Sequence, residues 1–150
     1  MATHIESVEE LPSLVGTELG VTEWTKVTQE QVDRFADATG DHQWIHTDPE
    51  RAASGPFGGT IAHGFLTLSL TPKVVADVLQ IGDMQAALNY GLNKVRFPAP
   101  VPVGSNVRAA VGIASARQKP SGIEVVFNVR FESDAATKPV CVAESLVLYR

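Results

Sequence analysis

An aspartate and a histidine lie five residues apart in the stretch Gly40-Asp41-His42-Gln43-Trp44-Ile45-His46. A carboxylate and an imidazole can together hold a water molecule and move its protons, which is general acid/base chemistry. Trp44 and Ile45 are large apolar residues in a stretch that would otherwise be polar, and apolar walls are typical of acid/base sites. The stretch is therefore a candidate site for acid/base catalysis.

Helix-boundary signals stand on both sides of this stretch. Thr28, three residues before a glutamine, predicts a capping box that opens a short helix, and Gly40 is a natural residue for the end of that helix. Asp48 followed by Pro49 predicts the start of a second short helix. We therefore expect Asp41 to His46 to be a non-helical link whose two ends are fixed by rigid elements.

A second stretch with chemical potential is Thr60-Ile61-Ala62-His63-Gly64-Phe65, where a Gly-rich loop enters a long apolar segment. The first turn of a helix has backbone N–H groups without intrahelical partners. Gly64 could therefore bring an N–H group close to a developing oxyanion, with no side chain in the way. Glycine at a helix start also serves as simple steric relief, and no nucleotide-binding glycine pattern is present.

The same residues allow other interpretations. A metal site would use imidazole and carboxylate ligands, but the H-E-x-x-H pattern is absent and Gly40 argues against a continuous helix, so we expect no metal. A serine nucleophile is disfavoured because no G-x-S-x-G pattern occurs. Cys141 is interpreted as a small apolar residue on a strand. The candidate metal ligands are Asp41, His42, His46 and His63.

Composition narrows the class of protein. The chain has 150 residues, of which 44% are hydrophobic and 19% charged, so we expect one domain, residues 1–150. A net charge of −5 argues against nucleic acid as a partner. An acidic N-terminus without an apolar core predicts no signal peptide, and no apolar run is long enough to span a membrane. With one cysteine, we expect a cytoplasmic protein.

Hydrophobic periodicity divides the chain into two parts. We expect a leader helix near residues 8–14, a strand near 20–27 and a buried helix over 62–79, which Pro72 either kinks or splits into two helices meeting at Thr71. Four strands follow as a meander, near residues 88–97, 107–115, 123–131 and 140–149. This order predicts an α+β fold with the helix against one face of an antiparallel sheet.

Three segments resemble one protein family. They run from Phe35-Ala36-Asp37 to Glu50-Arg51-Ala52, from Gly59 to Phe65, and from Asn89 to Ser105. Together they closely resemble the MaoC-like hydratases, which are (R)-specific enoyl-CoA hydratases, and most of all the single-domain actinobacterial type related to nodulation protein N. The resemblance implies the hot-dog fold, in which a long central helix is wrapped by a five-stranded antiparallel sheet. It also implies a homodimer.

The resemblance assigns roles to individual residues. Asp41 and His46 fall where the family holds its catalytic water, and Gly64 falls where a backbone N–H meets the thioester carbonyl. The implied reaction is reversible hydration of trans-2-enoyl-CoA to (3R)-hydroxyacyl-CoA, with CoA as part of the substrate and no cofactor. A serine that some members place in the central helix falls at Pro72 here, beside Thr71. The expected substrate contacts are Trp44, Ile45, Gly59, His63, Lys94 and Arg96, the last two for CoA phosphates.

Two other functions are open at this point. A hot-dog thioesterase would use the same fold and ligand but would hydrolyse the thioester. A non-catalytic acyl-CoA-binding or dimerisation module would share the fold without the chemistry, since fold does not fix function. The intact pair of Asp41 and His46 argues against the second alternative.

Overall fold

The computed structural model describes residues 2–150. Its helical elements are the 3-10 helix η1 (Val8–Leu14) and the α-helices α1 (Gln29–Thr39), α2 (Trp44–Thr47), α3 (Pro49–Ala53), α4 (Gly64–Ser69) and α5 (Thr71–Val78). Its strands are β1 (Thr3–Ile5), β2 (Glu18–Val21), β3 (Thr25–Lys26), β4 (Leu79–Ile81), β5 (Ala87–Arg96), β6 (Asn106–Lys119), β7 (Gly122–Ser133) and β8 (Cys141–Tyr149). The expected α+β class is confirmed.

The main sheet is antiparallel and has the strand order β2-β6-β7-β8-β5, with the short β3 also paired to β6. The five strands of this path match the expected sheet. The expected meander is wrong for β5, which pairs with β8 at the far edge instead of with β6. Alternation of apolar and polar residues shows which face of a strand is buried. It does not show which other strand pairs with it, because pairing depends on the connections and on packing. β1 and β4 form a separate parallel pair.

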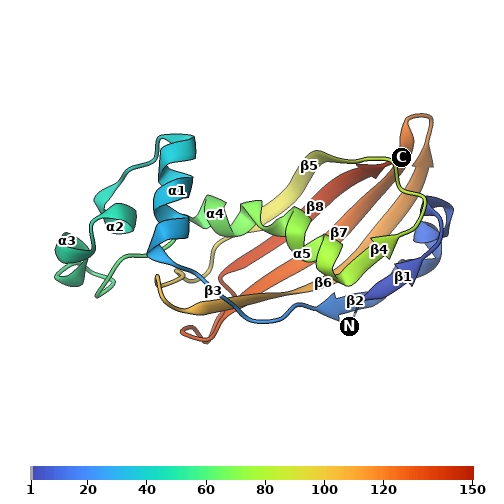
Figure 1. Cartoon of the computed structure of the whole chain (residues 1–150). Coiled ribbons are helices and arrows are strands. Elements are labelled where there is room, and N and C mark those ends of the chain that lie inside the picture. Colours follow the sequence, from blue (N-terminus) through green and yellow to red (C-terminus); the bar gives the residue numbers. More distant parts are fainter. Residues whose placement is uncertain (1) are drawn as a thin grey trace.

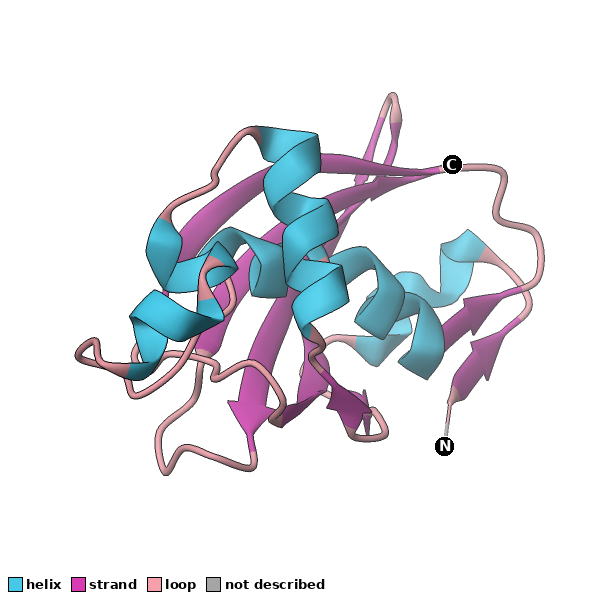
Figure 2. Cartoon of the chain, turned by 60° about the vertical axis from the view of Figure 1, so that its left-hand side comes forward, coloured by secondary structure: helices cyan, strands magenta, loops and turns pink. Residues whose placement is uncertain are grey.

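α1, α2 and α3 are grouped at one end of the molecule, whereas α4 and α5 run end to end across one face of the curved sheet (Figures 1 and 2). Alternate residues of the central strands point toward α4 and α5, including the fully buried Phe127 and Phe131. On the helical side the core receives Leu66 from α4 and Val78 from α5. The apolar stripe of the central segment therefore packs on the inner face of the sheet, as the periodicity predicted.

The central helix is two helices rather than one kinked helix. Leu70 joins them and accepts the first hydrogen bond of α5, from the N–H of Val74, at 3.0 Å. Pro72 lies in the first turn of α5, where a missing N–H removes no intrahelical hydrogen bond. The proline is thus placed where it is tolerated, and it sets the position of the break.

The predicted helix boundaries around the candidate site are confirmed. The hydroxyl of Thr28 accepts the N–H of Gln31 at 3.1 Å, Gly40 ends α1 with φ 84°, and Asp48 caps α3. The link between them is not wholly irregular, because its second half forms the single turn α2, which contains His46. One turn is too short to show a periodic pattern in a sequence, which explains why the link was predicted to be non-helical.

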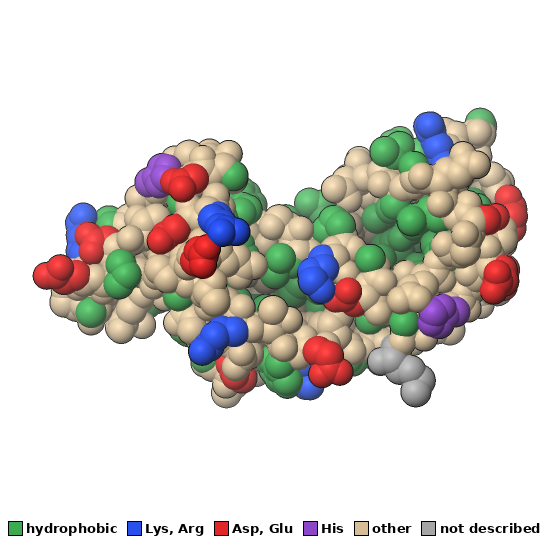
Figure 3. All heavy atoms as spheres, in the orientation of Figure 1, with side chains coloured by type: hydrophobic (Ala, Val, Ile, Leu, Met, Phe, Trp, Pro, Cys, Tyr) green, Lys and Arg blue, Asp and Glu red, His purple; other side chains and the backbone are tan. Residues whose placement is uncertain are grey.

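Hydrophobic side chains also gather in a hollow between α5, β4 and β5 (Figure 3). Val75, Met84 and Tyr149 are among the residues that line it.

Within residues 2–150, none of the helices combines the length and the apolar character that a membrane crossing requires.

The cap at the start of α1 offers a test of the local structure. Thr28→Ala removes the acceptor for an unpaired N–H group, so we expect the free energy of unfolding to fall by about 1 kcal/mol. Urea denaturation followed by circular dichroism measures this change. Thr28→Ser keeps the hydroxyl and should stay close to wild type, whereas an equal loss in both variants would contradict the capping role.

Candidate active site

Asp41 is positioned by the end of α1. Gly40 adopts a left-handed conformation, and its N–H donates to the carbonyl of Ala36 at 2.8 Å, which stops the helix one residue before Asp41. The carboxylate of Asp41 is exposed, and one of its oxygens accepts the N–H of Gln43 at 3.4 Å. Most of the acceptor capacity of this carboxylate is therefore free, and Asp41 is one of the residues that line the pocket described below.

His46 is buried, and a short contact fixes its orientation. Its Nδ1 lies 2.7 Å from the carbonyl oxygen of Ile61. A carbonyl can only accept a hydrogen bond, so Nδ1 carries the proton and Nε2 of the neutral ring has a free lone pair. His46 thus offers a proton acceptor whose direction is set by the backbone of a different segment.

A glutamine holds the backbone of His46 in place. The side-chain amide nitrogen of Gln29 donates to the carbonyl of His46 at 2.7 Å, and its oxygen accepts the hydroxyl of Thr60 at 2.7 Å. Gln29 is the first residue of α1, so one side chain connects α1, α2 and the Gly-rich loop. The sequence analysis missed this role because a glutamine at a helix start has no motif that distinguishes it from a surface residue.

The segment Thr60–Ala62 is the fixed support of the site. The N–H of Ile61 donates to the carbonyl of Ile45 at 3.0 Å, on the side of α2. On the other side, Ala62 donates to Val101 at 2.8 Å and Val103 donates to Thr60 at 2.9 Å. Both neighbours are therefore hydrogen-bonded to this extended segment, which delivers the next two residues, His63 and Gly64, to the pocket.

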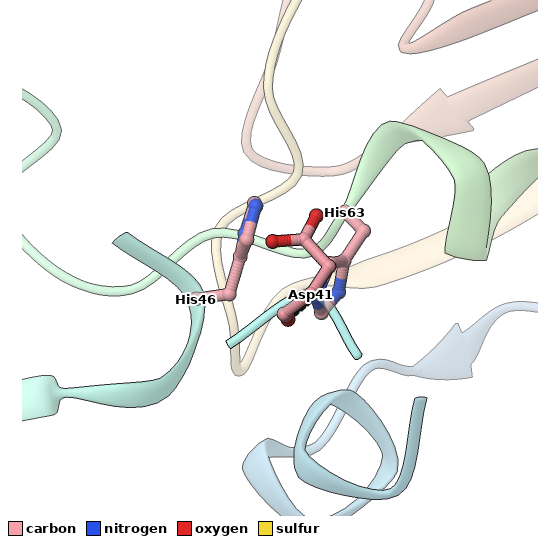
Figure 4. Close-up of side chains that lie close together, drawn as sticks. All are labelled: Asp41, His46 and His63. Carbon is pink, nitrogen blue, oxygen red and sulfur yellow. Dashed lines mark hydrogen bonds between the residues drawn. The ribbon is translucent and has the colours of Figure 1, made fainter. Parts of the chain in front are cut away.

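Asp41, His46 and His63 come together from three separate segments (Figure 4), and their side-chain ligand atoms all lie within 4.8 Å of one another. The two imidazole rings are stacked, with centroids 3.9 Å apart and an interplanar angle of 25°. Stacked rings direct their in-plane lone pairs side by side rather than toward one point, which is a poor arrangement for two ligands of one metal ion. His42 is exposed and lies near Asp37 instead, at 3.7 Å.

These polar groups and several aromatic side chains line the same open pocket. It is lined by Phe35, Thr39, Asp41, His46, His63, Gly64, Phe65 and Phe97. Phe65 and Phe97 are exposed and meet edge to face at the rim, with centroids 6.1 Å apart. The pocket therefore combines the candidate acid/base pair with an apolar rim, a combination suited to a substrate with one polar reacting end.

Gly64 begins α4, so its N–H has no intrahelical partner. A Cβ atom at this position would lie 3.1 Å from the ring of Phe97. The absence of a side chain therefore keeps the pocket open between the start of α4 and the aromatic rim. Gly64 lies beside Asp41 and His46 as expected, with a backbone donor available to a ligand.

Other predicted contact residues lie elsewhere. The ring of Trp44 packs under the guanidinium of Arg51 at 4.4 Å, and a Cβ at Gly55 would lie 3.1 Å from it. Ile45 takes part through its backbone carbonyl, and Gly59 has open space around it. None of Trp44, Ile45 and Gly59 lines the pocket. Phe35 and Phe97, which do line it, lie within the segments that carried the family resemblance but had been assigned no role.

Lys94 and Arg96 share one face of β5, as their spacing predicted, and that face is the outer one. Lys94 lies opposite Glu144 and Arg96 lies opposite Val142, whereas the intervening Ala143 points into the core. The two cations therefore line a groove on the side of the sheet away from the helices. The sequence predicted that they lie together but not on which side.

Cys141 is fully buried, and burial raises the pKa of its thiol to about 11. The thiol therefore stays protonated at neutral pH, and a protonated thiol is a poor nucleophile. This agrees with the interpretation of Cys141 as an apolar residue of the core.

Comparisons with known proteins agree with this geometry. Residues 10–135 match the model of the MaoC-like domain family. The chain is 52% identical over 145 residues to the 3-hydroxyacyl-thioester dehydratase Z of Mycobacterium tuberculosis, with 96% of each chain covered. It is 43% identical over 148 residues to nodulation protein N of Rhizobium leguminosarum, covering 97% of this chain and 92% of that protein.

The fold is also that of a solved hydratase. The unliganded R-hydratase PhaJ1 from Pseudomonas aeruginosa superposes with a TM-score of 0.75 at 25% identity, covering 95% of this chain and 84% of that one. Helices on the inner face of an antiparallel sheet are thus the hot-dog arrangement that the resemblance implied. With the matched domain spanning most of its length, the chain belongs to the MaoC-like family.

Proposed function

We propose that this protein adds water reversibly to the double bond of trans-2-enoyl-CoA thioesters and gives (3R)-hydroxyacyl-CoA. It is a hydro-lyase of enoyl thioesters, in keeping with the dehydratase and hydratase named among its relatives. The observation that carries the proposal is the shared pocket of three groups: the carboxylate of Asp41, the unprotonated Nε2 of His46 and the backbone N–H of Gly64.

In the proposed mechanism the thioester carbonyl accepts the N–H of Gly64. This hydrogen bond withdraws electron density from C3 and stabilises the enolate oxygen that forms when water attacks there. One O–H of the water donates to the carboxylate of Asp41 and the other donates to Nε2 of His46. Asp41 takes a proton as the water oxygen bonds to C3, and the pair then returns one proton to C2.

The remaining parts of the substrate have candidate contacts as well. Phe65 and Phe97 give the acyl group an apolar rim next to the reacting carbons. For the phosphates of CoA, Lys94 and Arg96 stay our candidates, on the outer face of the sheet. Phe97 directly follows Arg96, so the carrier would leave the pocket past Phe97 and cross to that face.

We propose the cytoplasm as the location, since the single cysteine is a free thiol.

The direct test is a hydration assay with enoyl-CoA substrates of four to sixteen carbons, followed by chiral analysis of the product. Consumption of crotonyl-CoA with formation of the (3R) alcohol would support the proposal. Release of free CoA would identify a thioesterase instead, and binding without turnover would identify a non-catalytic module. The (3S) alcohol would contradict the assignment to the (R)-specific hydratases.

Removal of either member of the acid/base pair tests the mechanism. We expect Asp41→Asn and His46→Ala each to lower kcat for crotonyl-CoA by about 10²-fold or more, because each loses a proton acceptor for the water. The double variant should be little worse than the poorer single one, since the pair acts on one water. Asp37→Asn and His42→Ala, the exposed neighbouring pair, are the matched controls. Near wild-type rates in Asp41→Asn and His46→Ala would refute the assignment.

Metal removal tests the alternative use of the histidines. We expect activity to be unchanged after dialysis against EDTA and after addition of Zn²⁺, because the stacked rings of His46 and His63 are poorly placed to share one metal ion. Metal content measured before and after dialysis serves as the control. Loss of activity that Zn²⁺ restores would show that the histidines are ligands.

We also propose that the protein is a homodimer joined along β5. β5 pairs with β8 on one side, and no other strand within residues 2–150 pairs with it. Leu88, Tyr90 and Leu92 on this strand are 44%, 62% and 48% exposed. An open edge with exposed apolar side chains is a surface that folded proteins normally cover.

Light scattering should therefore report about twice the chain mass of 16.0 kDa. Leu92→Lys places a charge on the proposed interface, so we expect a shift toward monomer with a loss of activity. Val21→Lys, an equivalent change on the opposite edge strand β2, should remain dimeric. A fully active wild-type monomer would contradict this assembly.

A further inference from the structure

His63 contacts both members of the acid/base pair, although the proposed mechanism uses neither of its ring nitrogens. Its Nε2 lies 3.0 Å from the backbone carbonyl oxygen of Asp41, and its ring stacks on that of His46. The side chain lines the pocket wall but is only 3% exposed. A group so deeply buried has little surface to offer a substrate, which calls for a different role.

The hydrogen bond to Asp41 fixes both a tautomer and a backbone position. The carbonyl oxygen can only accept, so Nε2 of His63 carries the proton. The other hydrogen bonds at Asp41 are long, with 3.4 Å from its N–H to the hydroxyl of Thr39 and 3.4 Å from its carboxylate to the N–H of Gln43. The contact from His63 is therefore the shortest hydrogen bond that holds Asp41.

The ring of His63 is held from two sides. Phe35 of α1 packs against it with centroids 4.9 Å apart, and His46 of α2 stacks on it at 3.9 Å. One planar ring therefore fills the space between α1 and α2 at the site. A planar side chain of this thickness fixes how far the imidazole of His46 lies from the link that carries Asp41.

The remaining nitrogen shows that packing alone does not explain a histidine here. Nδ1 of His63 is buried and has no hydrogen-bond partner among the described residues. A buried polar atom without a partner is unfavourable, so a phenylalanine would satisfy the packing better. What a phenylalanine lacks is the Nε2–H donor to Asp41.

We infer that His63 is a positioning residue that sets the separation of Asp41 and His46, with its Nε2–H on the backbone of one and its ring against the other. The role in turnover rests on the proposed hydratase function. Water held between two acceptors reacts only at a narrow range of distances, so a small displacement of either group lowers the rate without changing substrate affinity.

The test compares two substitutions in the whole protein with crotonyl-CoA as substrate. His63→Phe keeps a planar ring but removes the donor, so we expect kcat to fall by roughly 10- to 100-fold, the scale of a displaced reacting group, with KM little changed. The thermal midpoint should not fall, because the unpaired Nδ1 is removed. His63→Gln keeps a donor near the place of Nε2 and should recover most of kcat. His4→Phe, at the exposed position of β1, is the matched control.

Full kcat in His63→Phe would overturn the inference, as would a loss in His63→Phe that His63→Gln does not recover. Nitrogen-15 NMR of the wild type tests the contact without any activity. We expect the Nε2–H tautomer at His63 and the Nδ1–H tautomer at His46, whereas an Nδ1–H tautomer at His63 would refute the contact. If the wild type hydrates no enoyl-CoA, the proposed function fails while the tautomer result still decides the positioning contact.

Discussion

The extended segment Thr60–Ala62 is the constraint on which the site depends. It is hydrogen-bonded to α2 on one side and to residues 101–103 on the other, so it cannot move without breaking contacts with both. The carbonyl of Ile61 fixes the tautomer of His46, and the hydroxyl of Thr60 fixes Gln29. A segment without regular secondary structure can hold reacting groups accurately only where its own backbone donors and acceptors are paired in this way.

This arrangement explains how short elements build a rigid pocket. α2 is a single turn and α4 has six residues, and neither would be stable alone. Each gains order from contacts outside itself: α2 from Gln29 and Ile61, and α4 from the core residues beneath it. The large sheet contributes most of the core, and the candidate catalytic groups lie beyond its edge on segments that the core holds only indirectly.

Features set by neighbouring residues could be predicted from the sequence. The cap at Thr28, the left-handed Gly40 and the cap at Asp48 each depend on two to four adjacent positions, and all three were correct. Features set by distant residues could not. The place of β5 beside β8 and the bridging role of Gln29 depend on packing between segments that the sequence separates.

The family resemblance predicted more than the local sequence signals did, because it contains information about tertiary structure. It assigned Asp41, His46 and Gly64 to one site, and the structure places the three around one pocket. It did not distinguish residues that line the pocket from residues that support it. Trp44 and His63 both occur within the matched segments, yet Trp44 packs against Arg51 and His63 stacks on His46.

The burial of Cys141 has a consequence for the chemistry that this chain handles. An enoyl thioester is a Michael acceptor, and a thiolate can add to the same carbon that water attacks. The chain contains one cysteine, and that thiol lies fully buried in the sheet with its pKa raised to about 11. With neither exposure nor the thiolate form available, this thiol is not a target for alkylation by the protein's own substrate.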